Sequence, residues 1–160
     1  MKQIPVIIGI ALTSLWAGCS STPLAVAPVG PNPFGVNNHA QDGQLEVFSA
    51  ITGRSEGDDP AWFQHTGYSL YDAQGRKVKR VDNTVGYYAS RPRVISLPPG
   101  KYIVKAEAKD FRAVEVPVTV KAGKTTRVHL DGNWHPANAS SASVVDLPSG
   151  APVGWKTDAW

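Results

Sequence analysis

Hydrophobic and polar residues alternate in short runs through the middle of the chain, and Gly, Pro or Asp separate the runs. The run 101–109 has Tyr, Val or Ala at its even positions and mostly Lys and Glu at its odd ones. The run 113–121 repeats this arrangement with valines along one face. Such alternation is typical of strands that are buried on one side. We therefore predict strands here and in the further runs 45–51, 65–71, 76–81, 93–97 and 125–130.

Turn residues stand where these strands must be joined. Asp72-Ala73-Gln74-Gly75 has Asp and Gly at the first and fourth positions of a type I turn, and Gly123 offers a positive φ. Pro117 cannot donate to a strand ladder, so its strand is expected at an edge or with a bulge. No longer segment has apolar residues at helical spacing. The predicted fold class is all-β, a single antiparallel two-sheet β-sandwich of about seven strands over residues 44–131.

The amino terminus has the order of residues found in a secretory signal. Lys2 precedes an apolar run over residues 4–16, and the small residues Ala17 and Gly18 follow. The run is shorter than the roughly 18 to 20 apolar residues that cross a bilayer. Residues 1–18 are therefore predicted to be a signal peptide and not a permanent membrane span.

The stretch Leu15-Trp16-Ala17-Gly18-Cys19 resembles the lipobox of bacterial lipoprotein precursors, although Trp16 stands where that family usually has Leu. The resemblance implies that Cys19 becomes the first residue of the mature chain and carries acyl chains. More than one acyl chain gives stable membrane anchoring. Ser20 at the next position implies, by the sorting rule of that family, the outer membrane of a diderm bacterium. An ordinary signal peptide followed by a stray cysteine is the alternative.

Two segments flank the predicted domain. Residues 19–43 are rich in proline and carry no charge before Asp42, so we expect a flexible, extended tether that spaces the domain from the membrane. Residues 132–160 form a tail with three tryptophans and a hairpin pattern around Pro148-Ser149-Gly150. The sequence leaves open whether this tail packs on its own domain or on a partner.

A second resemblance lies between Tyr68 and Gly132. The stretch LPPGKYIVKAEAKDF, residues 97–111, is similar to a hairpin of carboxypeptidase regulatory-like and PEGA-type domains, and YSLYDAQGRKV and VPVTVKAGKTTRVHLDG also resemble them. Asp110 stands where these families usually have Gly. The resemblance implies a transthyretin-like β-sandwich, in a module that is generally not an enzyme.

Composition narrows the possible functions. The formal net charge of +3 is too small to imply a nucleic-acid partner, and a single cysteine excludes an intramolecular disulfide. The chain has no H-E-x-x-H zinc motif and no G-x-x-x-x-G-K phosphate loop. We therefore expect a non-catalytic protein without a cofactor.

The candidate binding residues are cations and aromatic residues. A basic cluster suits lipid phosphates or an anionic envelope polymer, or is a solvated sheet face: Arg76, Lys77, Lys79, Arg80, Arg91 and Arg93. Exposed rings could stack on sugars, and the candidates are Trp62, Tyr87, Tyr88 and Trp155. The alternative for Trp62, Phe63, Tyr68 and Tyr71 is that they fill the core.

Two groups of residues carry side chains that can bind metal ions. The loop 53–60 gathers three carboxylates, Glu56, Asp58 and Asp59, which are ligands that calcium prefers, but their spacing does not fit an EF-hand. An exposed acidic loop is the alternative. His129 and His135 stand close in sequence, yet lone histidines are more often solvated or held in the core, and we predict no metal there.

The sequence therefore predicts a lipid-anchored protein of the cell envelope. Its membrane contact is the lipidated Cys19, and its β-sandwich is expected to be a structural or protein-interaction module. The alternative is a carbohydrate- or peptidoglycan-binding module that uses exposed aromatic rings.

Overall fold

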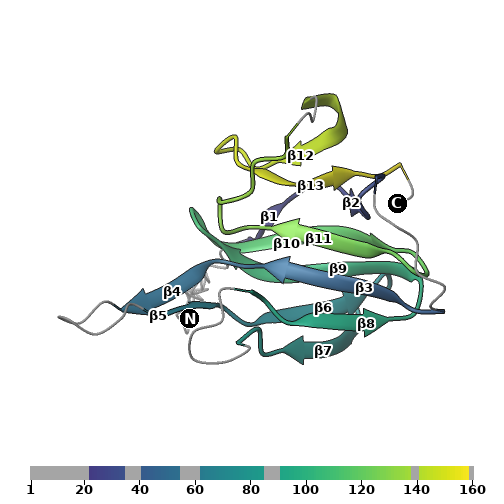
Figure 1. Cartoon of the computed structure of the whole chain (residues 1–160). Coiled ribbons are helices and arrows are strands. Elements are labelled where there is room, and N and C mark those ends of the chain that lie inside the picture. The colour runs from purple at the N-terminus through teal and green to yellow at the C-terminus, as the bar shows by residue number, and fades with distance from the viewer. Residues whose placement is uncertain (1–21, 35–40, 55–61, 85–90, 138–140, 159–160) are drawn as a thin grey trace, which may run out of the picture.

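The computed structural model describes residues 22–34, 41–54, 62–84, 91–137 and 141–158, and these residues form an all-β protein (Figure 1). Among them the only helical element is a 3-10 turn, η1 (Ser141–Ser143). The strands are, in chain order, β1 (Leu24–Ala25), β2 (Val29–Gly30), β3 (Gly43–Phe48), β4 (Ile51–Arg54), β5 (Trp62–His65), β6 (Tyr68–Asp72), β7 (Lys77–Val81), β8 (Val94–Leu97), β9 (Gly100–Ala108), β10 (Phe111–Val120), β11 (Thr125–His129), β12 (Val144–Asp146) and β13 (Pro152–Lys156).

The larger sheet has the strand order β12-β13-β2-β10-β9-β6-β7, and β1 also pairs with β10. Its centre is the antiparallel pair β9 and β10, the two strands with the clearest alternation in the sequence. Gly75 and Gly123 have positive φ in the two predicted turns, and the carboxylate of Asp72 accepts a hydrogen bond from the backbone N–H of Gln74. Both turns are therefore confirmed.

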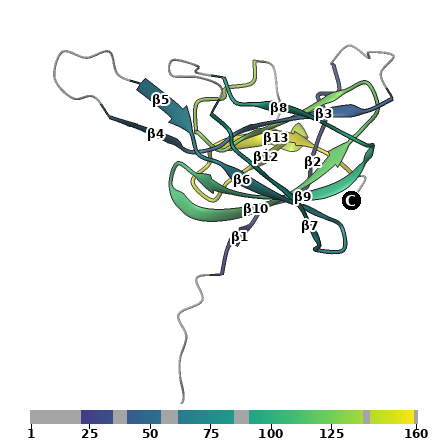
Figure 2. The same cartoon turned by 90° about the horizontal axis from the view of Figure 1, so that it is seen from below.

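The smaller sheet has the order β11-β3-β8, and β4 and β5 form a separate antiparallel hairpin. In this sheet β3 runs antiparallel to β8 but parallel to β11. Figure 2 shows β3 and β8 on one side of the molecule and β1, β9 and β10 on the other. The prediction of an all-β fold is confirmed.

The prediction of purely antiparallel pairing among about seven strands is wrong. Both sheets are mixed, because β1 and β2 run parallel to β10 and β3 runs parallel to β11. Alternation shows which side of a strand is buried, but it does not show which strand lies beside it or in which direction that strand runs.

The core lies between the two sheets. Val104 and Val116 contribute from β9 and β10, and Leu45, Val47 and Val128 contribute from the smaller sheet, all with exposed fractions of 0%. Tyr68 is also buried here, so the alternative that it fills the core is confirmed.

The segment before β3 differs from the unpacked tether expected from the sequence. Leu24 and Ala25 pair with β10, and Val29 is fully buried between β10 and β13. Pro117 explains how this pairing is arranged: β1 pairs with β10 before it and β2 pairs with β10 after it, so β10 is an interior strand and not the predicted edge. Its register shift lies between Phe111 and Val114, away from the proline.

The tail packs on its own domain. The strands β12 and β13 form the predicted hairpin, and β13 extends the larger sheet by pairing Trp155 with Gly30 and Lys156 with Val29. A Cβ atom on Gly154 would lie 2.5 Å from Val29 Cγ1 and 2.9 Å from the carbonyl oxygen of Arg127. The tail hairpin is thus seated closely against the start of the domain. The described part of the chain contains no helix with the length and apolar character needed to cross a bilayer.

Candidate functional site

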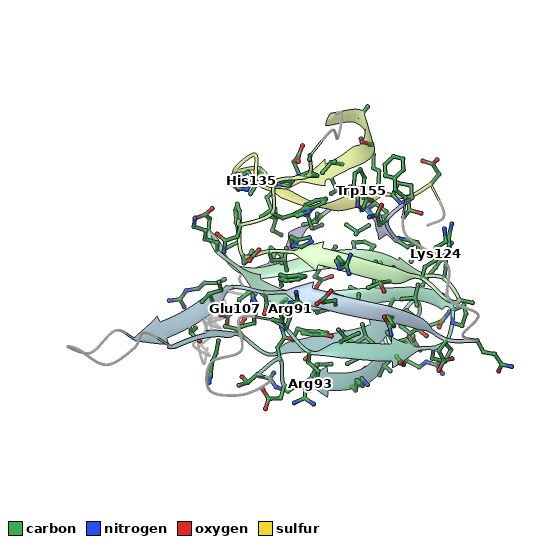
Figure 3. All side chains as sticks on the ribbon, in the orientation of Figure 1. Arg91, Arg93, Glu107, Lys124, His135 and Trp155 are labelled. Carbon is green, nitrogen blue, oxygen red and sulfur yellow. The ribbon has the colours of Figure 1, made fainter. Side chains whose placement is uncertain are left out.

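All six cations of the predicted basic cluster are exposed, and two of them, Arg76 and Arg93, also contact groups of the scaffold. Arg76 Nε lies 2.7 Å from Asp72 Oδ2, across the turn that joins β6 and β7. Arg93 Nε donates to the carbonyl oxygen of Asp82 at 2.8 Å, and its NH2 group donates to that of Thr84 at 3.2 Å. Arg76 and Arg93 are therefore engaged by the scaffold (Figure 3 labels Arg93).

Lys77, Lys79 and Arg80 lie on β7, which is the edge strand of the larger sheet, and all three are exposed. Charged side chains on an edge strand discourage pairing with a second chain. Arg91, labelled in Figure 3, is also exposed and precedes β8. Edge protection alone is a sufficient reason for the cations of β7. Their charge therefore does not by itself indicate a binding site, and the geometry of the side chains around them decides whether there is one.

That geometry comes from one row of residues across the larger sheet. Cross-strand pairing places Ala25, Glu115, Lys105, Ser69 and Arg80 in line on adjacent strands. Directly paired residues point to the same face of a sheet. Because the next row, with Leu70 and Val104, is fully buried, this row lies on the outer face.

The outer face is hollowed beside this row into a groove of about 220 Å³. We call it the basic groove, and its main lining residues are Pro23, Gly67, Ser69, Arg80, Lys105 and Arg112. Small residues make the hollow: a Cβ atom at Gly67 would lie 3.0 Å from the carbonyl oxygen of Val81 and 3.7 Å from Arg80 Nη2.

Lys105 lies at the wall of the groove with two partners. Its Nζ is 2.7 Å from Glu115 Oε1 and 4.9 Å from the ring centroid of Tyr71. The hydrogen bond to Glu115 raises the pKa of Lys105, so its ammonium group stays charged at neutral pH. Tyr71 is half-buried on this face and carries the cation over its ring, instead of filling the core.

A second feature is a continuous series of ring contacts, which we call the aromatic ladder: Phe34, Trp155, Trp134, His129 and Phe48. His129 is stacked between Phe48 and Trp134, with centroid distances of 4.4 and 4.6 Å. Trp155 meets Trp134 and Phe34 edge-on, each at 5.8 Å. Figure 3 shows Trp155 on the side of the molecule where β12 and β13 lie. The ladder ties the tail to β3 and β11.

Burial lowers the pKa of His129 to about 4, and the charges of Arg127 and His65 add to this effect. The imidazole is therefore neutral at pH 7. His135 is exposed, and its Nδ1 lies 3.3 Å from the carbonyl oxygen of Asn133. The two histidines thus have separate surroundings, one between aromatic rings and one in solvent.

The ladder borders a small hollow of about 120 Å³, and a larger cavity of about 530 Å³ lies nearby. Ala50, Ile51, Lys109, Asp131 and Asn133 line the larger cavity. Asn133 Nδ2 donates to Asp131 Oδ2 at 3.2 Å, so an amide and a carboxylate stand together beside an ammonium group. We call this the end cavity.

Several predicted residues lie outside the described residues: Cys19, Tyr87, Tyr88 and the carboxylates of the acidic loop, Glu56, Asp58 and Asp59. The backbone of Trp62 belongs to β5, but the side chains of Trp62 and Phe63 are outside the description. The sequence around this loop, Gly53-Arg54-Ser55-Glu56-Gly57, also matches the G-x-S-x-G pattern of serine hydrolases. That pattern is typical of a strand followed by a helix. The next described strand after β4 is β5, with which it pairs, and Ser55 itself lies outside the described residues.

Sequence reasoning missed the residues that complete each surface. Lys105 and Arg112 were part of no predicted cluster, because cross-strand pairing and not sequence distance brings them beside Arg80. Phe34 precedes the domain in the sequence and Trp134 follows it, yet both contact Trp155. The available signal was the concentration of tryptophan in the tail, since such large apolar rings need a packing surface.

Comparison of the chain with protein-family models, with curated proteins and with solved structures finds no match. The two resemblances noted in the sequence therefore remain expectations.

Proposed function

We propose that this chain is a lipid-anchored protein of the bacterial cell envelope, whose transthyretin-like β-sandwich is a non-catalytic interaction module. One observation carries the proposal. The lipobox-like stretch ends at Cys19, and only five residues later Leu24 begins to pair with β10. A predicted cleavage site that is followed within a few residues by a packed strand is what we expect of an anchor that joins the folded domain directly.

This arrangement also orients the domain. The anchor would join on the β1 side, which Figure 2 shows opposite β3 and β8. The smaller sheet would therefore be presented away from the membrane. Its edge strand β8 offers unpaired backbone groups to which a strand of a partner could add, and Val94 on this strand is 47% exposed.

Membrane fractionation tests the anchor. We expect the wild-type chain and a Ser21→Ala control in the membrane fraction after a high-salt wash, and a Cys19→Ser variant in the soluble fraction. A Cys19→Ser variant that remains in the membrane to the same extent contradicts the proposal.

Site-specific crosslinking tests the partner. A photoreactive residue at Val94 is expected to capture one reproducible envelope protein in intact cells, whereas the same group at the exposed turn residue Gln74 should not. Equal labelling from both positions, or none from Val94, counts against an interaction through the smaller sheet.

The end cavity favours a second candidate function, carbohydrate binding. Its volume of about 530 Å³ lies within the roughly 300–1,000 Å³ of small-molecule sites. Asp131 and Asn133 offer an acceptor and an amide of the kind that fix sugar hydroxyls. Retention on purified peptidoglycan that is lost in Asn133→Ala but kept in a His135→Ala control would support this candidate, and no retention of the wild type would remove it.

A further inference from the structure

The outer face around the basic groove combines positive charge with small residues. Four cations, Lys77, Arg80, Lys105 and Arg112, stand there against two carboxylates, Glu107 and Glu115. Glu115 is already paired with Lys105, while Arg80 and Arg112 are exposed. An anion that enters the groove would meet two guanidinium groups, which bind phosphate oxygens in a fork geometry.

The groove lies next to the place where the chain leaves toward Cys19. Pro23 is one of its lining residues. Cys19 stands four residues before Pro23, and four residues span at most about 14 Å when fully extended. An acylated Cys19 would sit at the bilayer surface, so Pro23, at the wall of the groove, would lie within about 14 Å of the headgroups. This upper limit is less than two Debye lengths, each about 8 Å at physiological ionic strength, so the headgroup charges act on the groove most strongly when the linking residues are not fully extended.

We propose that the basic groove binds the phosphate of anionic phospholipid headgroups, so that the outer face of the larger sheet rests on the membrane that holds the anchor. This inference rests on the proposed lipidation of Cys19. The sequence alone predicted that a long tether holds the domain away from the bilayer. In this proposal the domain lies on the bilayer, and charge attraction keeps it there. The short anchor holds the groove near the headgroups, which raises their effective concentration at the site.

The test uses the complete mature protein, extracted in detergent and reconstituted into vesicles. Because Cys19 is the only cysteine and is blocked when acylated, one added cysteine gives a unique reporter. Ala113→Cys places it among the lining residues of the groove, and Ser96→Cys places it on the exposed side of β8 in the opposite sheet. The readout is the rate of alkylation by a membrane-impermeant maleimide.

On phosphatidylglycerol vesicles we expect alkylation of Ala113→Cys to be at least about tenfold slower than on phosphatidylcholine vesicles, since each cation near an anionic surface contributes roughly a fivefold preference for binding. The rate for Ser96→Cys should be the same on both vesicles. Replacing Arg80→Gln and Arg112→Gln together should abolish the protection at position 113. The matched control, Lys121→Gln with Lys124→Gln, should keep it; Figure 3 shows Lys124 at the opposite end of the sheets from Glu107, which also lines the groove.

The outcomes separate the two proposals. Intact mass reports the acyl chains on Cys19 independently of the alkylation rates. A lipidated protein whose Ala113→Cys reacts equally fast on both vesicles overturns the groove alone, as does protection that survives in the double glutamine variant of Arg80 and Arg112. An unmodified Cys19 overturns the anchor and, with it, the docking. Protection by a soluble anionic envelope polymer without vesicles would assign the groove to a glycan and contradict the lipid site.

Discussion

The central hairpin, β9 with β10, and the tail hairpin, β12 with β13, are both antiparallel, but different interactions hold them. The central hairpin is paired along most of its length and buries a row of valines, including Val104 and Val116. The tail hairpin joins the sheet through two register pairs, Trp155 with Gly30 and Lys156 with Val29, and through the aromatic ladder. It also adds Val145, Leu147 and Val153 to the margin of the common core. The position of the tail hairpin therefore depends on β2, in the segment that follows the proposed anchor. The central hairpin depends on the pairing between its own two strands and on the core beneath them.

Matched leucine substitutions should give the largest difference between the two regions. Leu70→Ala, next to Val104 in the core, should lower the free energy of unfolding of the whole domain by about 2–5 kcal/mol. Leu147→Ala, in the tail, should loosen the tail hairpin while the main transition moves less. Denaturant unfolding followed by circular dichroism and by tryptophan fluorescence separates the two effects. Equal shifts of the main transition would mean that the tail is part of one cooperative unit.

Acidification should destabilise the folded protein through His129, the residue of β11 on which Trp134 of the tail stacks. Its folded pKa is about 4 and its ordinary value is 6.5, so the unfolded chain takes up the proton first. This contribution to stability is constant above about pH 6.5 and falls by about 3 kcal/mol as the pH drops to about 4. The measurement is the free energy of unfolding between pH 7 and 4. His129→Gln should remove this part of the slope and His135→Gln should keep it; identical slopes in both variants would contradict the assignment.

Steric substitution in β13 should detach the tail without unfolding the centre. Gly154→Val places side-chain atoms where Val29 and the carbonyl of Arg127 already lie, and such overpacking costs about 1–3 kcal/mol. Hydrogen exchange should then show faster exchange in β12 and β13 and unchanged protection in β9 and β10. Gly150→Asn, at a positive φ with open space around it, is the control. Unchanged exchange in the tail would show that β13 is not held by this close contact.

The smallest effect is expected at Tyr68, in the core beside the central hairpin. Its hydroxyl is buried and has no hydrogen-bond partner among the residues that the structure describes, and burial raises the pKa of this phenol. Tyr68→Phe removes an unsatisfied polar group and should raise the free energy of unfolding by about 1 kcal/mol. A rise in Tm would confirm this, with Tyr102→Phe as the control because the Tyr102 hydroxyl donates to Pro98. A lower Tm for Tyr68→Phe would contradict it.

The same contrast explains how far the sequence predicts the fold. Alternation located β7, β8, β9, β10 and β11 to within about two residues. Four of these strands have a buried and a more exposed face, whereas the edge strand β7 is exposed except at Val81. The two-residue strands β1 and β2 have no such local signal; they are strands because β10 and β13 offer backbone partners. The parallel pairing of β3 with β11 also depends on contacts that are distant in sequence.

The candidate surfaces follow the same rule. The sequence indicated Arg80 and Trp155, which belong to the basic groove and the aromatic ladder. It placed Arg76 and Arg93 in the same cluster, although both hold turns or connections of the scaffold. An arginine that stabilises a turn and an arginine that lines a groove cannot be distinguished by residue type. Only the contacts of each side chain in the folded protein distinguish them.

The mass of the amino-terminal peptide of the mature protein tests the central claim most directly. The account predicts a peptide that begins at Cys19 and carries a diacylglyceryl group on sulfur and an acyl chain on nitrogen, in protein extracted from the membrane fraction. An amino terminus at another residue, or an unmodified thiol at Cys19, would contradict the anchor and the orientation that follows from it.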